Sequence, residues 1–145
     1  MNEVVVKSLI NLQNQVRYNS DGRAIITDEP REVGGDDAGP DPYSLLLGAL
    51  GSCISMTVKM YAKRKEWNLE GVEVRLTHER IHAEDCRVCE SSEGFVLRIN
   101  RRVEFRGDLT DEQRARLHEV ALKCPLHKTL SSEITFGEMD SEPTM

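Results

Sequence analysis

The chain has 145 residues, a length typical of one domain with a hydrophobic core, and 39% of them are hydrophobic and 30% charged, as in ordinary globular proteins. The formal net charge of −6 and the pI of about 5.3 argue against nucleic acid or an anionic membrane as a partner. We expect no signal peptide, because the segment MNEVVVKSLI has an early acid and no long apolar core. We also find no run of about 18 apolar residues, so we expect no membrane span and a cytoplasmic location.

Residues 1–40 are predicted to form N-terminal strands and a loop. The segment EVVVKSLINLQ begins with β-branched residues, and the turn signal SDG at residues 20–22 separates it from a returning strand, RAIIT. Residues 28–42 contain three prolines and three glycines, so we expect a loop there with special backbone conformations. Loops of this length in a compact domain are usually functional or mobile.

A central helix is predicted over residues 41–66. Asp41 can cap this helix, and Pro42 suits its first position. The segment LLLGALGSCISMTVKMYA is apolar on nearly every side, and only the last turns are polar. A helix with this pattern is buried on most sides, which is consistent with cover by a second subunit.

Two half-buried antiparallel strands are predicted within residues 72–106. The segments VEVRLTHERIH and FVLRINRRVEF both alternate apolar and polar side chains, and the loop AEDCRVCESSEG joins them. The two strands are therefore expected to form a hairpin.

Residues 110–145 are predicted to hold a second helix, a final strand and a tail. Thr110 and Gln113 fit a capping box at the start of the helix. One helical face then presents apolar side chains to the core, namely Leu117, Val120, Ala121 and Cys124. Pro125 is expected to disrupt the helix, and EITF to form the last strand.

The two predicted helices each place one cysteine toward the interior. Cytoplasmic thiols are normally kept reduced, so the four cysteines of the chain are interpreted as reactive, metal-binding or buried residues. Cys53 and Cys124 are then either two packed core thiols or a peroxidatic pair. In such a pair one thiolate becomes a sulfenic acid, and the second thiol condenses with it to form a disulfide.

The segments GPDPYSLLLGALGSCISMTVKMYAKRK and KCPLHKTL resemble the OsmC/Ohr family of organic hydroperoxide reductases, in its OsmC-like branch. The similarity includes DEPREVGG, WNLEGVEV and GDLTDEQRARL, so it covers nearly the whole chain and implies one OsmC-like domain over residues 1–145. The implied fold is α+β, with two central helices packed on curved antiparallel sheets in an intertwined homodimer. The active sites of such a dimer lie at the subunit interface.

The resemblance implies an antioxidant, stress-response oxidoreductase that is a thiol-dependent peroxidase. It would reduce organic hydroperoxides to alcohols through a Cys53 sulfenate and a Cys53–Cys124 disulfide. A small thiol or a dihydrolipoyl-type molecule is the implied reductant, and no organic cofactor is implied. The apolar side chains of Leu45, Leu46, Leu50 and Met56 either line the substrate pocket or pack in the core.

The resemblance also assigns an activating arginine. Arg31, in PREVGG, matches the OsmC-type position, and Arg23, in DGRA, is the reserve candidate. Physical chemistry gives an independent reason to expect such a residue. Burial raises the pKa of a mid-helix thiol such as Cys53, and a close guanidinium group lowers that pKa.

The sequence departs from the family after the helix-opening proline. The family commonly has a glutamate there that holds the arginine, whereas this chain has Tyr43 and Ser44, which carry no negative charge at neutral pH. Either the arginine is mobile and the activity weak, or another group holds it, such as the Tyr43 hydroxyl or one of the acids Glu32, Asp36, Asp37 and Asp41.

A second cysteine pair lies in the segment HERIHAEDCRVCE. Cys86 and Cys89 form a CxxC, and His78 and His82 precede it. This set fits a tetrahedral zinc site, a redox dithiol able to reduce the Cys53–Cys124 disulfide or to form its own, or an inert loop. The alternative function is therefore a non-enzymatic OsmC-like binding module with a zinc or redox CxxC. His127, three residues after Cys124, is a candidate for tuning that thiol.

Overall fold

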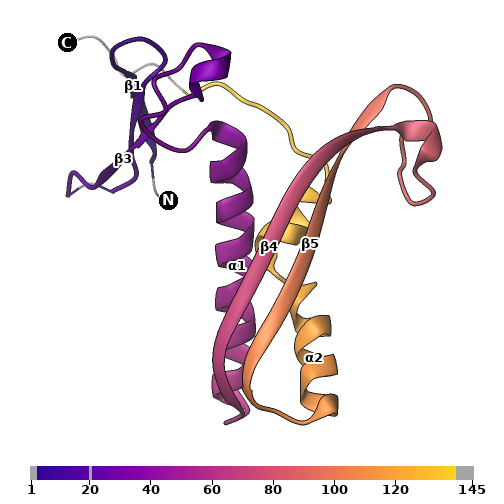
Figure 1. Cartoon of the computed structure of the whole chain (residues 1–145). Coiled ribbons are helices and arrows are strands. Elements are labelled where there is room, and N and C mark those ends of the chain that lie inside the picture. Colours follow the sequence, from indigo (N-terminus) through magenta and orange to yellow (C-terminus); the bar gives the residue numbers. More distant parts are fainter. Residues whose placement is uncertain (1–2, 20, 140–145) are drawn as a thin grey trace. The chain divides into compact units, whose positions relative to one another are not determined.

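The computed structural model describes residues 3–19 and 21–139 of the chain (Figure 1). These residues form two compact units, Met1–Ala49 and Leu50–Met145. The division falls inside the first long helix. A single domain over 1–145 stays a prediction.

The first unit contains a three-stranded antiparallel sheet in the order β1-β2-β3. Its strands are β1 (Val5–Ser8), β2 (Asn14–Arg17) and β3 (Ala24–Thr27). The β2–β3 pairing confirms the predicted returning strand, while Ser20 of the predicted turn lies outside the described residues. The expected loop after β3 is also confirmed, and it contains one short 3₁₀ helix, η1 (Arg31–Val33).

Asp28 organises this loop from its buried position. Its carboxylate accepts hydrogen bonds from the backbone N–H groups of Glu29, Asp36 and Ala38 at 2.8, 3.0 and 3.1 Å. Burial raises the pKa of Asp28, but these three donors outweigh burial and lower it overall. Gly35 is needed for the same close packing, because a Cβ there would collide with the Glu29 carbonyl.

Helix α1 (Pro42–Arg64) begins as predicted. The Asp41 carboxylate accepts from the backbone N–H groups of Tyr43 and Ser44 at 3.2 and 3.3 Å. Only one stripe of α1 is buried, at Leu50, Ile54, Val58 and Ala62. The expectation of burial on most sides is therefore wrong for the single chain, in which the side chains of Met56 and Met60 are 61% and 62% exposed.

By length and composition alone, α1 is also long and apolar enough to cross a membrane, with a mean hydropathy of 1.4 over its most apolar window. The sequence predicts no membrane span because it has no unbroken run of about 18 apolar residues, and Ser52 and Ser55 do interrupt the run in α1 without lowering its mean hydropathy much. The absence of a span stays a prediction. The core helix of a folded protein passes the same test.

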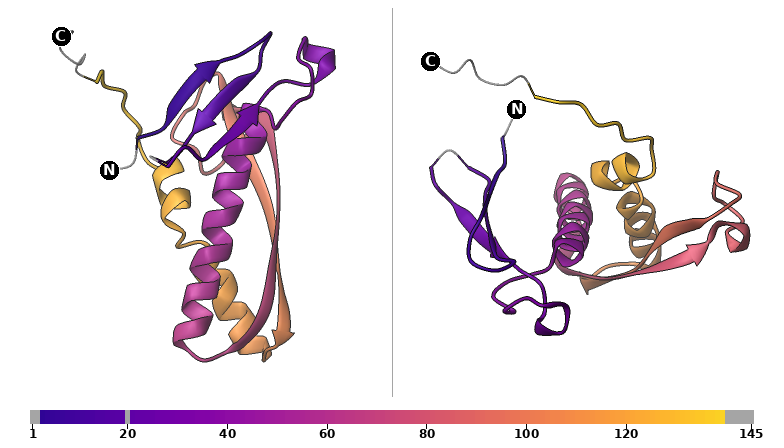
Figure 2. Two further views of the ribbon diagram at one scale, coloured as in Figure 1. Left: turned by 90° about the vertical axis from the view of Figure 1, so that its left-hand side faces the viewer. Right: turned by 90° about the horizontal axis from the view of Figure 1, so that it is seen from above.

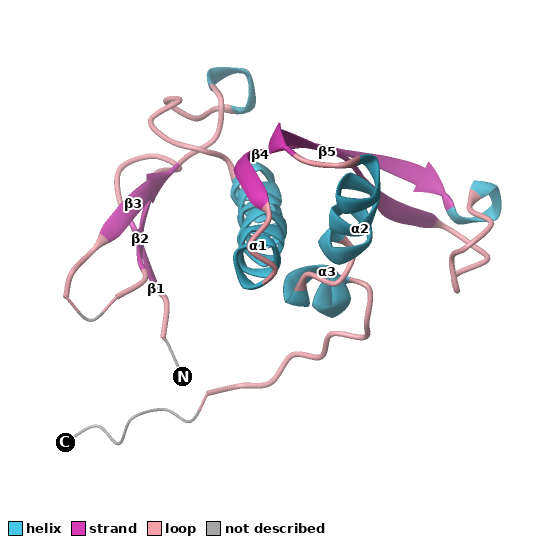
Figure 3. Ribbon diagram, turned by 90° about the horizontal axis from the view of Figure 1, so that it is seen from below, coloured by secondary structure: helices cyan, strands magenta, loops and turns pink. Residues whose placement is uncertain are grey.

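The second unit is built on a long hairpin of β4 (Asn68–His82) and β5 (Phe95–Asp108), which pair antiparallel. The hairpin was predicted, although its strands are longer than expected. Helices α2 (Asp111–Ala121) and α3 (Pro125–Leu130) lie on the same face of the hairpin as the C-terminal part of α1 (Figures 2 and 3).

The core of this unit lies between the helices and the hairpin. The buried stripe of α1 meets Leu117, Ala121 and Cys124, and apolar side chains of both strands, such as Val74 and Val103, cover this cluster. The Thr110–Gln113 capping box at the start of α2 is confirmed, with both reciprocal bonds present.

One of two expectations for the C-terminal region is confirmed and the other is wrong. The predicted helix does not continue through Pro125: α2 ends at Ala121, and Pro125 begins α3, because the first helical position needs no N–H. Residues 133–139 contain no strand in the part of the chain that the structure describes, so the predicted EITF strand is not formed.

Candidate active site

The fold of the second unit brings Cys53 and Cys124 together. Cys53 lies on α1 and is half-buried, whereas Cys124 is completely buried just before α3. Their side chains are joined by a hydrogen bond. Both thiols are free, so the pair is a dithiol.

The start of α3 supplies hydrogen-bond donors to both sulfurs. The backbone N–H of Leu126 donates to Cys53, and that of His127 donates to Cys124 Sγ at 3.4 Å. The first N–H groups of a helix have no partner within the helix, so they are available for this purpose. Pro125 places them by starting the helix directly after Cys124.

These contacts make the two thiols unequal. Burial raises the pKa of Cys53, but hydrogen bonds from Cys124, the Leu126 backbone and Thr57 outweigh it, so that pKa is lowered overall. Burial also raises the pKa of Cys124, and the hydrogen bond that it donates to Cys53 raises it further. The surroundings therefore favour the thiolate form at Cys53 more than at Cys124.

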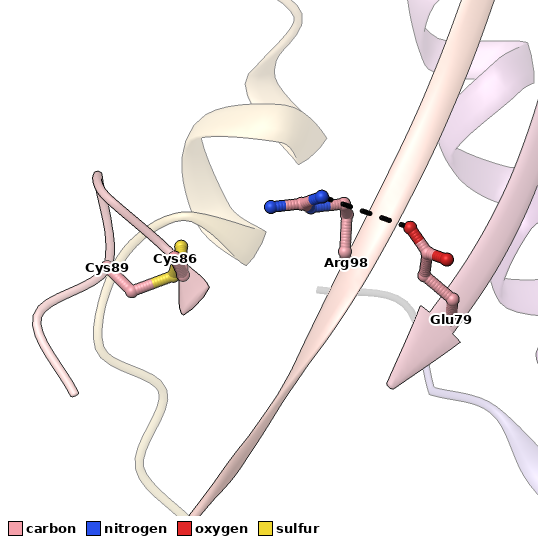
Figure 4. The surroundings of a disulfide bond; sticks show 4 residues. All are labelled: Glu79, Cys86, Cys89 and Arg98. Atoms are coloured by element: carbon pink, nitrogen blue, oxygen red, sulfur yellow. Dashed lines mark ion pairs between the residues drawn. A yellow bond between two sulfur atoms is a disulfide. The ribbon is translucent and has the colours of Figure 1, made fainter. Parts of the chain in front are cut away.

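The second cysteine pair, in the CxxC, is oxidised to a disulfide. Cys86 and Cys89 form a disulfide with a Cα–Cα distance of 5.5 Å, in the loop between β4 and β5 (Figure 4). Among residues 3–19 and 21–139, no group of three or more His, Cys, Asp or Glu side chains is placed to hold a metal ion. His82 stacks on Phe95 instead, with ring centroids 4.5 Å apart. The structure therefore does not assemble the zinc set considered from the sequence.

A cavity of about 440 Å³ is lined by Cys86 and Cys89, whereas Cys53 and Cys124 do not line it. Its walls are mainly apolar side chains of α1, the hairpin and α3, and its polar groups include Arg98, Arg101 and His127. The disulfide forms part of its rim. Of the four apolar residues proposed to line a substrate pocket, Leu50 does so, while Met56 lies 61% exposed on α1.

The family model for OsmC-like proteins matches residues 34–138, which include Cys53, Cys124 and the CxxC. The chain belongs to the OsmC-like family. A comparison with curated proteins found no match.

Solved structures of the OsmC/Ohr family share the fold of this OsmC-like chain. The OsmC-like protein of Mycoplasma pneumoniae is 19% identical, with a TM-score of 0.70 over 90% of this chain and 87% of that one. An organic hydroperoxide resistance protein OsmC of Legionella pneumophila is 18% identical, with a TM-score of 0.63 over 90% and 88%. Organic hydroperoxide resistance protein OhrB of Bacillus subtilis is 19% identical, with a TM-score of 0.60 over 89% of each chain. These likenesses confirm the predicted α+β fold.

The arginine candidates of this OsmC-like chain both lie in the first unit. Arg31 is exposed at the start of η1, and Arg23 pairs with Asp21 at 3.1 Å. Two of the acids proposed to hold the arginine already have partners, because Asp41 caps α1 and Asp36 accepts from Asn11 and Gln13. The activating role of Arg31 stays a prediction.

Sequence reasoning missed two groups that act on Cys53, which are Thr57 and the Leu126 backbone. The sequence offered two signals for these groups. Thr57 lies one helical turn after Cys53, and Pro125 directly follows Cys124. The Thr57 hydroxyl donates to the Cys53 carbonyl at 2.8 Å, and its single proton can rotate toward the sulfur.

Replacing Thr57 by valine removes this hydroxyl at nearly constant volume. The pKa of Cys53 is expected to rise, so less thiolate is present at pH 7 and alkylation by iodoacetamide slows, by up to about tenfold for each unit of pKa. Thr57→Ser, which keeps the hydroxyl, is the control and should react like the natural protein. Equal alkylation rates for Thr57→Val and the natural protein would contradict this role.

Proposed function

We propose that this OsmC-like protein is a thiol-dependent peroxidase that reduces organic hydroperoxides to alcohols. The observation that carries the proposal is the unequal dithiol, in which a half-buried Cys53 of lowered pKa touches a buried Cys124 of raised pKa. Several proteins of the same fold are named organic hydroperoxide resistance proteins, which supports this choice of substrate class.

The first step uses Cys53 as the nucleophile. Its thiolate attacks the distal oxygen of the hydroperoxide, so a sulfur–oxygen bond forms, the oxygen–oxygen bond breaks and an alkoxide leaves. The Cys124 thiol is the nearest proton donor, and its proton converts the alkoxide to the alcohol. Cys53 is then a sulfenic acid and Cys124 a thiolate.

The second step closes the disulfide. The Cys124 thiolate attacks the Cys53 sulfur, the sulfur–oxygen bond breaks, and the departing hydroxide becomes water with a proton from solvent. The two side chains already share a hydrogen bond, so the resolving sulfur starts next to its target. A small thiol or a dihydrolipoyl-type molecule then restores the two thiols, and no organic cofactor takes part.

We also propose that the protein acts as a cytoplasmic homodimer. The exposed methionines of α1, Met56 and Met60, support this assembly, because a second subunit would remove their apolar surface from water. The intertwined arrangement implied by the family resemblance would provide such a cover.

Arg31 is proposed to lower the pKa of Cys53 further and to orient the peroxide. Arg31→Ala is therefore expected to slow alkylation of Cys53 at pH 7 by about tenfold if the pKa rises by one unit. Arg23→Ala is the matched control. A slower reaction in Arg23→Ala alone would transfer the role to Arg23, and unchanged rates in both variants would contradict an activating arginine in the first unit.

The decisive test uses the double variant Cys86→Ser/Cys89→Ser, in which Cys53 and Cys124 are the only thiols. One equivalent of cumene hydroperoxide added to the reduced variant should yield one equivalent of cumyl alcohol and a Cys53–Cys124 disulfide, mapped by peptide mass. Two intact thiols and unreacted peroxide would overturn the peroxidase proposal. The cavity of about 440 Å³ would then favour the binding-module alternative.

A further inference from the structure

Arg101 is a charged residue on the core-facing side of the hairpin. Successive side chains of β5 point to opposite faces, so Arg101 shares a face with Ile99 and Val103, which both pack against the hydrophobic core. Its partner in the ladder, Leu76 on β4, packs against the same core. An arginine is rarely buried on such a face unless a specific group pairs with it.

The guanidinium group of Arg101 has an unused donor. Arg101 Nη1 is buried and has no hydrogen-bond partner among residues 3–19 and 21–139. Arginine stays protonated in proteins, so loss of a proton cannot relieve this cost. A buried charged donor is costly unless an acceptor or an anion reaches it, and the group is therefore suited to an anion from outside this part of the chain.

The positive charge of Arg101 also lacks a counter-charge in its cavity. Arg98, Arg101 and His127 line the cavity of about 440 Å³, and no Asp or Glu of the described residues lines it. Arg98 already pairs with Glu79 at 4.0 Å, beside the disulfide (Figure 4). Burial lowers the pKa of His127, and the charge of Arg101 lowers it further, so this imidazole is neutral at pH 7. Arg101 is thus the cation that remains for a ligand.

The other walls of the cavity are mainly apolar. They are formed by Leu50, Ile81, Val96, Leu97, Ile99 and Leu130. Val88 also lines the cavity and is 94% exposed, so the cavity opens to solvent at the CxxC loop. Its volume lies within the range of roughly 300–1,000 Å³ that is typical of small-molecule sites. One buried cation among apolar walls matches a ligand with one anionic group and an apolar body, whereas inorganic phosphate would leave the walls without contacts.

We propose that this cavity binds an amphipathic carboxylate, whose carboxylate group pairs with Arg101 and whose hydrocarbon body lies against the apolar walls. A guanidinium group can donate two parallel N–H bonds to the two oxygens of a carboxylate. Cys53 and Cys124 do not line the cavity, so the ligand is bound without chemical change. The inference therefore does not depend on the proposed peroxidase function.

The test is isothermal titration calorimetry of the natural chain with octanoate as the probe. Octanoate should bind at about one molecule per chain, and acetate should bind at least about 100-fold more weakly because it lacks the hydrocarbon chain. Arg101→Met should weaken octanoate binding at least about tenfold but leave binding of the uncharged 1-octanol unchanged. Absence of saturable octanoate binding, or an equal loss for octanoate and 1-octanol, would overturn the proposal.

Arg102→Met is the matched control for charge. Arg102 is the next residue on β5, but it is exposed on the opposite face and pairs with Glu104 at 3.4 Å. This variant should bind octanoate like the natural chain. If Arg101→Met and Arg102→Met weaken octanoate binding equally, the general positive charge of the hairpin attracts the probe, and the assigned pairing with Arg101 is wrong.

Cys53→Ser separates this site from the dithiol. Because Cys53 does not line the cavity, the variant should bind octanoate with the affinity of the natural chain even though it lacks the proposed nucleophile. Loss of octanoate binding in Cys53→Ser would place the probe at the dithiol and overturn the proposal. Failure of the peroxidase assay would leave this binding result unaffected.

Urea denaturation without octanoate tests whether an acidic side chain of a second subunit pairs with Arg101. Removal of an unpaired buried cation should not lower the urea midpoint, so Arg101→Met should be at least as stable as the natural chain. A carboxylate of a second subunit at this position would lose its partner in Arg101→Met, and the midpoint would fall. A lower midpoint would therefore overturn the small-molecule site.

Discussion

Cys53→Ser is expected to lower turnover of cumene hydroperoxide by about 1,000-fold or more, because a serine hydroxyl stays protonated at neutral pH and cannot replace the thiolate. The measurement is cumyl alcohol formed per minute with a dithiol reductant in excess. Ser52→Ala, an exposed neighbour on the same helix, is the control and should retain full turnover. Retained activity in Cys53→Ser would end the proposed mechanism.

The companion variant Cys124→Ser isolates the first half of the reaction. Cys53 should still react with one equivalent of peroxide, but the sulfenic acid has no resolving thiol at its side and should be trapped by dimedone. A normal disulfide on Cys53 in this variant would implicate Cys86 or Cys89 as resolving residues. Both results are read from the mass of the peptide that contains Cys53.

Leu117→Ala should reduce the free energy of unfolding by about 2–5 kcal/mol, since Leu117 is completely buried and truncation leaves a cavity. Its partners in the core are the buried stripe of α1 and Cys124. Urea denaturation checks the loss, and Glu112→Ala on the exposed side of α2 should cost less than about 1 kcal/mol.

The same variant has a consequence for the site. Cys124 belongs to the cluster that Leu117 supports, so a cavity at position 117 should admit alkylating reagents to Cys124 and speed its modification. A loss below about 1 kcal/mol with unchanged Cys124 reactivity would show that α2 does not hold the thiol in its buried position.

Local signals predicted most of the elements. Asp41 and Pro42 mark the start of α1, Thr110 and Gln113 mark that of α2, and alternating side chains mark β4 and β5. Each of these signals acts over a few residues, through a capping bond or a pleat, so the sequence carries it without the rest of the fold.

The failures concern features that need a distant partner. EITF has the composition of a strand, but a strand requires a neighbour to pair with, and residues 133–139 have none among the described residues. The sequence pattern of α1 suggested burial on most sides, whereas the chain alone covers only one stripe. Composition states how apolar a surface is, but not what covers it.

For the site, the sequence by itself determined which residues are the candidates, since the family resemblance pointed to Cys53 and Cys124 and the CxxC was visible as a motif. Only the tertiary structure decided which groups surround each cysteine. The difference in pKa between Cys53 and Cys124 depends on the Leu126 backbone N–H and on burial, and the cavity beside the CxxC is formed by residues from α1, the hairpin and α3. A backbone N–H donor or a cavity is not encoded by any particular residue type, so it can be recognised only in the folded structure.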